Sequence, residues 1–352
     1  MNVLSLFDGM SCGQLALDKA NIWYDDYFAS EIDKFAIQVT QKNYPLTHQL
    51  GDITKIKESD LPKIDLLIGG SPCQGFSFAG KQLNFEDPRS KLFFEYVRLL
   101  KECKPKYFLL ENVKMKKEYQ DVISSFLGVE PIEINSALVS AQNRKRLYWT
   151  NIEGITQPED RGILLKDILE NENQIEAKYY LSKEVLKGMD LHLKANTQRC
   201  ASGSCTTNKH NYQYIKINKK GYLKSNQDKG STYTAGAKSG GNHSDIDLIC
   251  VQMVGRKIDE NGTRKDNDPD LKNLQRLEAN ISGKSNCLTS VKKDNLLLIN
   301  ANVRRLTPVE VERLQTVPDH YTSLNSNSQR YKMLGNGFTI DVIAHILSFM
   351  KL

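Results

Sequence analysis

Near its start the chain reads Val3-Leu-Ser-Leu-Phe-Asp-Gly-Met-Ser-Cys-Gly13, and this stretch gives the first indication of the fold class. It opens with a short apolar run that ends at Asp8-Gly9, which is typical of a buried strand followed by a turn. From Gly13 onward the chain continues Gln-Leu-Ala-Leu-Asp-Lys-Ala, which spaces apolar residues as a helix does. The stretch therefore predicts a strand, a glycine-containing turn and a helix, in that order.

The same order of elements recurs along the first half of the chain. Strands are predicted at residues 26–31, 64–70 and 107–113, and helices at residues 35–42 and 91–103. Alternating strands and helices of this length predict an α/β fold with a doubly wound, mostly parallel, Rossmann-like sheet.

The texture of the sequence changes after Trp149. Residues 196–244 are rich in Gly, Ser, Thr, Asn and Lys, which predicts loops with short strands at most. Regular structure is expected again at Arg304, where Thr307, Pro308 and Glu310 have the spacing of a helix N-cap, first turn and capping carboxylate. A last helix is predicted at residues 340–350. We expect one domain from residues 1–154 plus 304–352, and a second, smaller, loop-rich domain from residues 155–303.

Composition suits two domains, because a chain of 352 residues with 39% hydrophobic and 26% charged residues can bury a full core. The net charge is +6, and residues 155–303 carry most of it, with 23 Lys and Arg against 18 Asp and Glu. An excess of this size indicates either a polyanionic partner or solubility alone.

The N-terminus has no basic segment followed by an apolar core, and no apolar run approaches the roughly 18 residues of a membrane span. The seven cysteines are odd in number and scattered, unlike a disulfide framework. We expect a chain that is neither secreted nor membrane-spanning, in a reducing cytoplasm.

The turn at residues 7–13 occupies the position where a doubly wound sheet binds a nucleotide-like ligand. The G-x-G-x-x-G fingerprint is absent, because only Gly9 and Gly13 are present, which disfavours a dehydrogenase. Glu31 follows the next strand and suits ribose hydroxyls, while Asp52 suits an adenine amino group. Each acid taken alone is also consistent with a solvated surface carboxylate, so the prediction of an adenosyl site depends on all three features together.

Cys73 lies just past a predicted strand, in the turn Gly69-Gly-Ser-Pro-Cys-Gln-Gly-Phe-Ser77. A cysteine there is either a small buried hydrophobe or a nucleophile. Glu111 ends another predicted strand at the same edge of the sheet, which favours the nucleophile. Arg144 and Arg146, in Gln-Asn-Arg-Lys-Arg, suit a base carbonyl, a phosphate or the bracing of Glu111.

Six motifs follow one another along the chain: Phe-Asp-Gly at 7–9, Ser-Pro-Cys at 71–73, Glu-Asn-Val at 111–113, Gln-x-Arg-x-Arg at 142–146, Arg-x-Leu-Thr-Pro-x-Glu at 304–310 and Gly-Asn-Gly at 335–337. In order and approximate spacing they resemble the cytosine-C5 DNA methyltransferase family, over the whole chain except residues 155–303. The resemblance implies methyl transfer from S-adenosylmethionine to C5 of a cytosine flipped out of duplex DNA.

The resemblance also implies roles for individual residues. Cys73 is similar to the family's covalent nucleophile at C6, Glu111 to the partner of N3, and Arg144 and Arg146 to the arginines around the base. Residues 74–91 resemble a loop that closes over DNA, with Gly80 lending flexibility. Expected DNA contacts from this part of the chain are Ser71, Gln74, Gly75 and Ser77. Expected cofactor contacts are Phe7, Asp8, Gly9, Met10, Ser11, Cys12, Gly13, Glu31, Ile32, Asp52, Ile53, Pro72, Asn336 and Gly337.

Two departures from the family pattern stand out. The first motif usually reads Phe-Ala-Gly-x-Gly-Gly, whereas here Asp8 replaces Ala and Ser11-Cys12 replace the later glycines. This variant resembles the animal de novo methyltransferases and some phage enzymes. The last motif usually ends in Ser or Ala, where this chain has Gly337. Both positions accept small residues, so we expect altered cofactor affinity at most.

Residues 155–303 correspond by position to the family's target-recognition region. Lys216, Lys219 and Lys220 alternate with tyrosines and suit phosphates, and Arg256 or Arg264 suits base edges. Cys200 and Cys205, with His210, are a conceivable zinc site, but their spacing is long and no metal is expected.

Two other functions remain open from the sequence. A branch of the same family methylates cytosine in transfer RNA, and other members are catalytically silent DNA-binding regulators. Retention of Cys73 and Glu111 disfavours a silent protein, and the long region 155–303 favours duplex DNA. A restriction endonuclease of the same site, a phage origin and a solitary enzyme are equally compatible with the chain, which we expect to be a monomer.

Overall fold

The computed structural model describes residues 1–71, 88–186, 190–193, 214–217, 223–225, 248–257, 265, 268–280, 282–289, 295–299 and 302–351. The chain divides into two compact units. Unit 1 comprises Met1–Ile163 and Val311–Leu352, and unit 2 comprises Leu164–Glu310. The expected second domain of 155–303 therefore differs from unit 2 by nine residues at its start and seven at its end.

Hydrogen bonds explain both shifts. At the first boundary, Arg161 N donates to Leu138 O at 2.8 Å and Gln157 Nε2 donates to Glu133 O at 2.9 Å, so residues 155–163 belong to unit 1. At the second, the Arg304 guanidinium bonds to Glu172, so the first residues after 303 belong to unit 2. Composition changes near 154 and 304, but these pairings decide where each unit ends.

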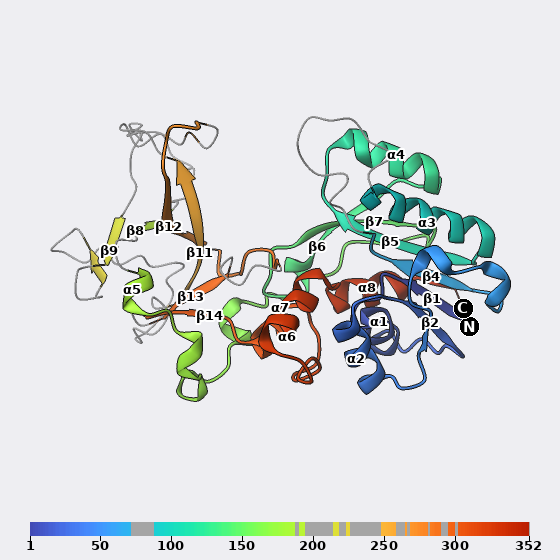
Figure 1. Ribbon diagram of the computed structural model, residues 1–352, viewed down its shortest axis with the longest axis horizontal. Coiled ribbons are helices and arrows are strands. Elements are labelled where there is room, and N and C mark those ends of the chain that lie inside the picture. The colour runs from blue at the N-terminus through green and yellow to red at the C-terminus, as the bar shows by residue number, and fades with distance from the viewer. Residues whose placement is uncertain are drawn as a thin grey trace. The chain divides into compact units, whose positions relative to one another are not determined.

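Unit 1 contains a seven-stranded sheet of order β3-β2-β1-β4-β5-β7-β6 (Figure 1). The first five strands in that order run parallel, and β7 pairs antiparallel with both β5 and β6. This arrangement confirms the predicted doubly wound, mostly parallel sheet. The strands are β1 Val3–Leu6, β2 Tyr27–Ser30, β3 His48–Gln49, β4 Leu66–Gly69, β5 Tyr107–Val113, β6 Ile132–Asn135 and β7 Lys145–Thr150.

Helices cover both faces of this sheet. Figure 1 shows α3 and α4 on one face and α1, α2 and α8 on the other. The predicted helix start after Thr307 is confirmed, because Thr307 Oγ1 accepts from Glu310 N at 3.2 Å and Glu310 Oε2 accepts from Thr307 N at 2.8 Å. The helices are α1 Cys12–Lys19, α2 Lys34–Asn43, α3 Pro88–Cys103, α4 Lys117–Leu127, α6 Pro308–Leu314, α7 Asn327–Asn336 and α8 Ile340–Leu347.

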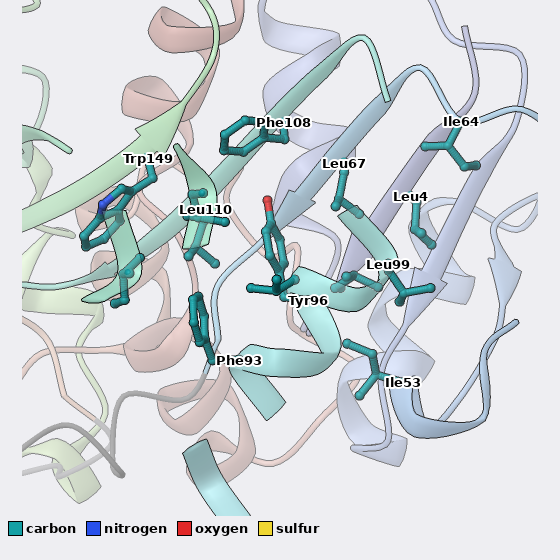
Figure 2. Close-up of a cluster of buried hydrophobic side chains, with 14 of the residues drawn as sticks. Leu4, Ile53, Ile64, Leu67, Phe93, Tyr96, Leu99, Phe108, Leu110 and Trp149 are labelled. Atoms are coloured by element: carbon teal, nitrogen blue, oxygen red, sulfur yellow. The ribbon is translucent and has the colours of Figure 1, made fainter. Parts of the chain in front are cut away.

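A core cluster of unit 1 lies between α3 and the sheet (Figure 2). Phe93, Tyr96 and Leu99 of α3 are fully buried and pack with strand residues such as Leu4 and Leu67. Each such side chain contributes about 1.5–3 kcal/mol when it leaves water. This packing holds the ends of β1 and β4 in fixed positions, which is what a site at the sheet edge requires.

Unit 2 contains a second sheet, of order β10-β9-β8-β12-β11-β13-β14. All its neighbouring pairs are antiparallel except β8 with β12. Val251, Leu277, Leu296 and Leu298 are buried in its core. The strands are β8 Asp190–Leu193, β9 Tyr214–Ile217, β10 Leu223–Ser225, β11 Leu248–Lys257, β12 Asn273–Asn280, β13 Leu296–Ile299 and β14 Asn302–Arg305, and a short helix, α5, spans Lys183–Leu186.

The described part of residues 196–244 is limited to β9 and β10, of four and three residues. The rest of that predicted loop region lies outside the described residues. Throughout the described ranges, the helices are too short or too polar to span a bilayer.

Candidate active site

Strand ends bring the predicted site residues of unit 1 to one edge of the sheet. The turn 7–13 follows β1, Glu31 follows β2, Ser71 comes two residues after β4, and Glu111 lies in the C-terminal half of β5. These four strands run parallel, so all of these ends point the same way. A ligand at this edge would lie near the switch point, which is between β1 and β4, where the strand order reverses.

The turn after β1 is held in an uncommon backbone conformation. Phe7, Gly9 and Ser11 have φ of 58°, 61° and 63°, in the left-handed region that only glycine adopts without strain. Asp8 N donates to Ser30 O at 3.0 Å, which ties the turn to the end of β2. The sequence could not show that Phe7 and Ser11 take this conformation.

Glu31 fixes the same turn from the side of β2. Its Oε2 accepts from Gly9 N at 2.8 Å, and its Oε1 accepts from Ile32 N and Asp33 N, each at 2.8 Å. The Ile32 side chain beside it is 78% exposed, so it presents an apolar surface at the site. The carboxylate thus links the turn to the segment that begins α2.

Asp52 and Ile53 differ in what they present. Asp52 Oδ1 accepts from Thr54 N at 3.0 Å and Thr54 Oγ1 at 2.9 Å, and these bonds, the backbone one first, lower the pKa of the carboxyl. Ile53 is buried in the core cluster of unit 1. Its side chain belongs to the core, and its predicted contact with a cofactor stays a prediction.

Asp8 is buried beneath the turn. Tyr27 Oη donates to Asp8 Oδ1 at 2.8 Å. Burial raises the pKa of Asp8 to about 6, while hydrogen bonds from Ser5, Tyr27 and Ser11 act against that rise. A Cβ at Gly13 would lie 2.3 Å from Tyr27 Oη, so the phenol can occupy this position only because residue 13 has no side chain. Tyr27 is a partner that sequence reasoning missed, since nothing near it signals a role.

Glu111 and Arg146 form an ion pair across β5 and β7. Arg146 Nε lies 3.0 Å from Glu111 Oε1, and both side chains are 12% exposed. Glu111 faces Tyr148 in the antiparallel register, and Arg146 is two residues before Tyr148, so the pair shares one face of the sheet. The sequence left three roles open for Arg146. The contact with Glu111 fits one of them, the bracing of that carboxylate.

Arg144 takes a different position from Arg146. Its side chain is buried, and Nη1 and Nη2 donate to the carbonyls of Gly335 and Gly337 at 3.2 and 3.0 Å. Gln315 Nε2 donates to the same Gly337 carbonyl at 3.2 Å. Two of the described bonds of Arg144 therefore hold residues 335–338, which we call the C-terminal turn. The predicted place of Arg144 beside the base stays a prediction.

Asn112 braces the segment that leads toward residue 73. Its Nδ2 lies 3.3 Å from both the carbonyl and the hydroxyl oxygen of Ser71, to which it donates. Ser71 itself is buried. The structure thus gives Ser71 a bracing contact, and its predicted contact with DNA stays a prediction.

Phe338 also lies at this edge, unforeseen from the sequence. A Cβ at Gly70 would meet Phe338 Cε1 at 2.9 Å and Glu111 Oε2 at 3.4 Å, so the ring and the carboxylate flank the same glycine. Asn336, two residues earlier, is exposed. Residues 337 and 338 therefore lie near Met10 and Cys12 and near Gly70, which Glu111 also flanks.

Several predicted residues are not placed. Outside the described residues lie Pro72, Cys73, Gln74, Gly75, Ser77, the other residues up to 87 of the predicted loop 74–91, Lys219, Lys220, Arg264 and the zinc candidates Cys200, Cys205 and His210. Residues 88–91 of that predicted loop belong to helix α3 instead. Lys216 lies in β9, opposite Lys224 of β10. Arg256 of β11 pairs with Glu278 of β12 through Nε and Nη2, at 3.0 and 2.9 Å. Among the described residues, no group of three or more His, Cys, Asp or Glu could hold a metal ion.

Comparisons with known proteins agree with this geometry. The model of the C-5 cytosine-specific DNA methylase family matches residues 1–351. The Type II methyltransferase M1.ScrFI of Lactococcus lactis subsp. cremoris is 31% identical over 344 residues, covering 92% of this chain and 71% of the relative. The orphan methyltransferase M.SPRI of Bacillus phage SPR is 28% identical over 428 residues, covering 98% and 96%.

Solved structures show the same fold. The S. pombe Dnmt2 methyltransferase superposes with a TM-score of 0.60 at 19% identity, covering 99% of this chain and 97% of that one. A putative DNA modification methyltransferase encoded within an E. coli prophage gives a TM-score of 0.55 at 19% identity, covering 99% and 98%. With the family match over nearly the whole chain, these findings show that the chain belongs to the C-5 cytosine-specific DNA methylase family and is a DNA cytosine-5 methyltransferase.

Proposed function

We propose that this protein transfers a methyl group from S-adenosylmethionine to C5 of a cytosine flipped out of a short specific sequence in duplex DNA. Cys73 is the nucleophile and forms a covalent bond to C6. The observation that carries the proposal is the Glu111–Arg146 pair, 3.0 Å apart and 12% exposed on each side. It lies at the edge where β4 ends, and Ser71, two residues before Cys73, is held there by Asn112.

The residues at the β1 and β2 ends fit S-adenosylmethionine. A Cβ at Gly9 or Gly51 would meet no atom within 4 Å, so there is space beside both turns. Glu31 and Asp52 supply the carboxylates that suit ribose hydroxyls and an adenine amino group. When bound, the cofactor supplies the methyl group as a sulfonium. Phe7, Asp8, Gly9, Met10, Ser11, Cys12, Gly13, Glu31, Ile32, Asp52, Ile53, Pro72, Asn336 and Gly337 would hold it.

The protein's own residues activate the base. The Cys73 thiolate adds to C6, and the electron pair of the C5–C6 double bond becomes available at C5, which then takes the methyl group. Glu111 hydrogen-bonds the N3 and amino edge of cytosine, and Arg146 offsets charge that develops on the ring. Removal of the C5 proton by a base restores the double bond as the S–C6 bond breaks, so Cys73 leaves as a thiolate.

Unit 2 supplies target recognition in this proposal. Its Lys216, Lys219 and Lys220 bind phosphates, and Arg256 and Arg264 face base edges or phosphates. The bidentate pair with Glu278 holds the Arg256 guanidinium in one orientation, which suits a fixed contact with the DNA. The relatives include a Type II and an orphan methyltransferase. The protein could therefore act beside a cognate restriction endonuclease or as a solitary enzyme, and in both cases we propose a monomer.

The test is expression in a host that lacks DNA methylation, followed by bisulfite sequencing of plasmid DNA. Protected cytosines in one short motif support the proposal and name the target sequence. Cys73→Ala should abolish protection, while the purified variant still binds S-adenosylmethionine and DNA. Wild-type methylation by Cys73→Ala would refute the mechanism.

Side-by-side assays on DNA and RNA separate the remaining functions. Methylation of RNA with no methylation of DNA would replace the proposal with an RNA cytosine methyltransferase. DNA binding with no methyl transfer to either substrate would identify a silent regulator.

A further inference from the structure

Cys12 and Gly337, far apart in the chain, lie against each other. Cys12 begins α1, and Gly337 directly follows α7. A Cβ added at Gly337 would lie 3.2 Å from Cys12 Sγ, 3.2 Å from the backbone oxygen of Met333 and 3.3 Å from Met10 Cε. The two side-chain distances are shorter than the roughly 3.5–4.0 Å of an optimal carbon contact. The two sulfur-containing side chains therefore occupy space that a side chain at 337 would need.

Backbone conformation does not explain the glycine. Gly337 has φ −71° and ψ 166°, which any residue adopts. Gly9 and Gly51, in contrast, have positive φ and open space at the Cβ position. At 337 the crowding comes from the Met10 and Cys12 side chains and from the Met333 carbonyl.

Neither neighbour can easily yield. Cys12 and Met10 are 2% and 1% exposed. The Phe338 backbone N–H donates to the Cys12 sulfur, and Tyr321 Oη donates to Met10 O at 2.8 Å. Burial raises the pKa of the Cys12 thiol to about 12, so it stays protonated and acts through its volume.

The C-terminal turn is equally fixed on its other side. Arg144 Nη2 and Gln315 Nε2 donate to the Gly337 carbonyl at 3.0 and 3.2 Å, and Gly337 N donates to Met333 O at 2.8 Å. A side chain at 337 would therefore have to displace either the turn at residues 7–13 or these hydrogen bonds.

We propose that Cys12 is a positioning residue for the cofactor, and that Cys12 and Gly337 are a matched pair setting the distance between the turn 7–13 and Asn336. The inference rests on the proposed function, since both turns are expected to contact S-adenosylmethionine. A side chain at 337 would then disturb the site, and shortening Cys12 would relieve part of that disturbance.

A double-mutant cycle tests this pair. The four proteins are the wild type, Gly337→Ala, Cys12→Ala and the double variant. We expect Gly337→Ala to weaken S-adenosylhomocysteine binding about tenfold in calorimetry. It should also lower the melting temperature of the unliganded protein by roughly 2–4 °C. Cys12→Ala removes one of the three atoms that a Cβ would meet, so the double variant should bind at least about threefold more tightly than Gly337→Ala.

Two further measurements exclude a general loss of stability. Cys103→Ala shortens another partly buried cysteine of unit 1, and combined with Gly337→Ala it should restore nothing. In Gly337→Ala the KM for S-adenosylmethionine should rise, whereas the KM for DNA should stay the same.

The outcomes are distinct. Wild-type affinity and melting temperature in Gly337→Ala, or equal rescue by Cys12→Ala and Cys103→Ala, would overturn the pairing. If the wild type bound no S-adenosylhomocysteine, both the cofactor assignment and the positioning role would be wrong. Melting temperatures of the four unliganded proteins would then still show whether positions 12 and 337 are coupled.

Discussion

Two ion pairs, one in each compact unit, use the same chemistry to different ends. In unit 2, Arg304 and Glu310 are both fully buried. All five N–H groups of Arg304 donate, to Glu310, Glu172 and the carbonyl of Arg305. In unit 1, Glu111 and Arg146 share one described contact and are each 12% exposed. A closed pair stabilises a fold, whereas a partly open pair can accept a substrate.

The closed pair should respond most strongly to substitution. Arg304→Met leaves Glu310 buried without its guanidinium, and we expect the free energy of unfolding of unit 2 to fall by about 3–5 kcal/mol. Denaturant unfolding measures this loss. The exposed neighbour provides the control, because Arg305→Met should change stability by less than about 0.5 kcal/mol. Equal losses in both variants would contradict the comparison.

Substitution in the Glu111–Arg146 pair should reduce catalysis more than stability. Glu111→Gln cannot pair with Arg146 or hold the cytosine edge as a carboxylate, so we expect kcat to fall about 10²- to 10³-fold. The free energy of unfolding should fall by less than it does in Arg304→Met, because the amide oxygen of Gln can still accept a hydrogen bond from Arg146 Nε. Single-turnover kinetics and denaturant unfolding check the two parts. Glu153→Gln, at an exposed position, should leave both unchanged.

Asp8 is a buried carboxyl whose described hydrogen-bond partners are the hydroxyl groups of Ser5, Tyr27 and Ser11. Its pKa in the fold is raised to about 6, so the folded state holds its proton after the unfolded state has lost it. Stability from this group is therefore present below about pH 4 and is lost as pH rises to about 6, by up to roughly 3 kcal/mol. Asp8→Asn removes the titration and keeps an acceptor for Tyr27.

The measurement is the unfolding free energy of Asp8→Asn minus that of the wild type, from pH 4 to pH 8. The difference should increase in favour of the variant up to about pH 6 and then level off. A difference that stays constant across this range would show that Asp8 is not buried as described.

The two arginines of the Gln-x-Arg-x-Arg motif should separate in kinetics. Arg144→Lys cannot bridge the carbonyls of Gly335 and Gly337, so we expect cofactor affinity to fall about tenfold. Arg146→Lys should lower kcat with little change in cofactor affinity. Isothermal calorimetry and steady-state assays distinguish the two patterns, and identical patterns would remove the distinction drawn from their positions.

The smallest effect is expected at an exposed pair. Arg313 and Asp319 of unit 1 lie 2.6 Å apart with side chains 32% and 41% exposed. Solvent screens such a pair, so Asp319→Asn should cost less than about 1 kcal/mol of unfolding free energy. A larger loss would mean that exposure alone does not separate the ion pairs of this protein.

Much of the fold could be predicted from local sequence. Apolar periodicity located the four central strands of unit 1, and Thr307 with Glu310 located a helix start. The order of these elements sufficed for a doubly wound sheet because parallel strands need crossover helices. The limits of the two compact units depend on hydrogen bonds between residues far apart in the chain, which composition does not reveal.

Residue types along the chain sufficed to predict the chemical groups of the candidate site: a nucleophile at Cys73, a carboxylate at Glu111, and a glycine turn followed by two acids. Their partners depend on the tertiary structure. It gave Arg146 to Glu111, put Arg144 under the C-terminal turn, and joined Cys12 to Gly337 across 325 residues. The physical reason is that residue type fixes what a side chain can donate, accept or attack, whereas close packing brings distant segments together and fixes which groups meet.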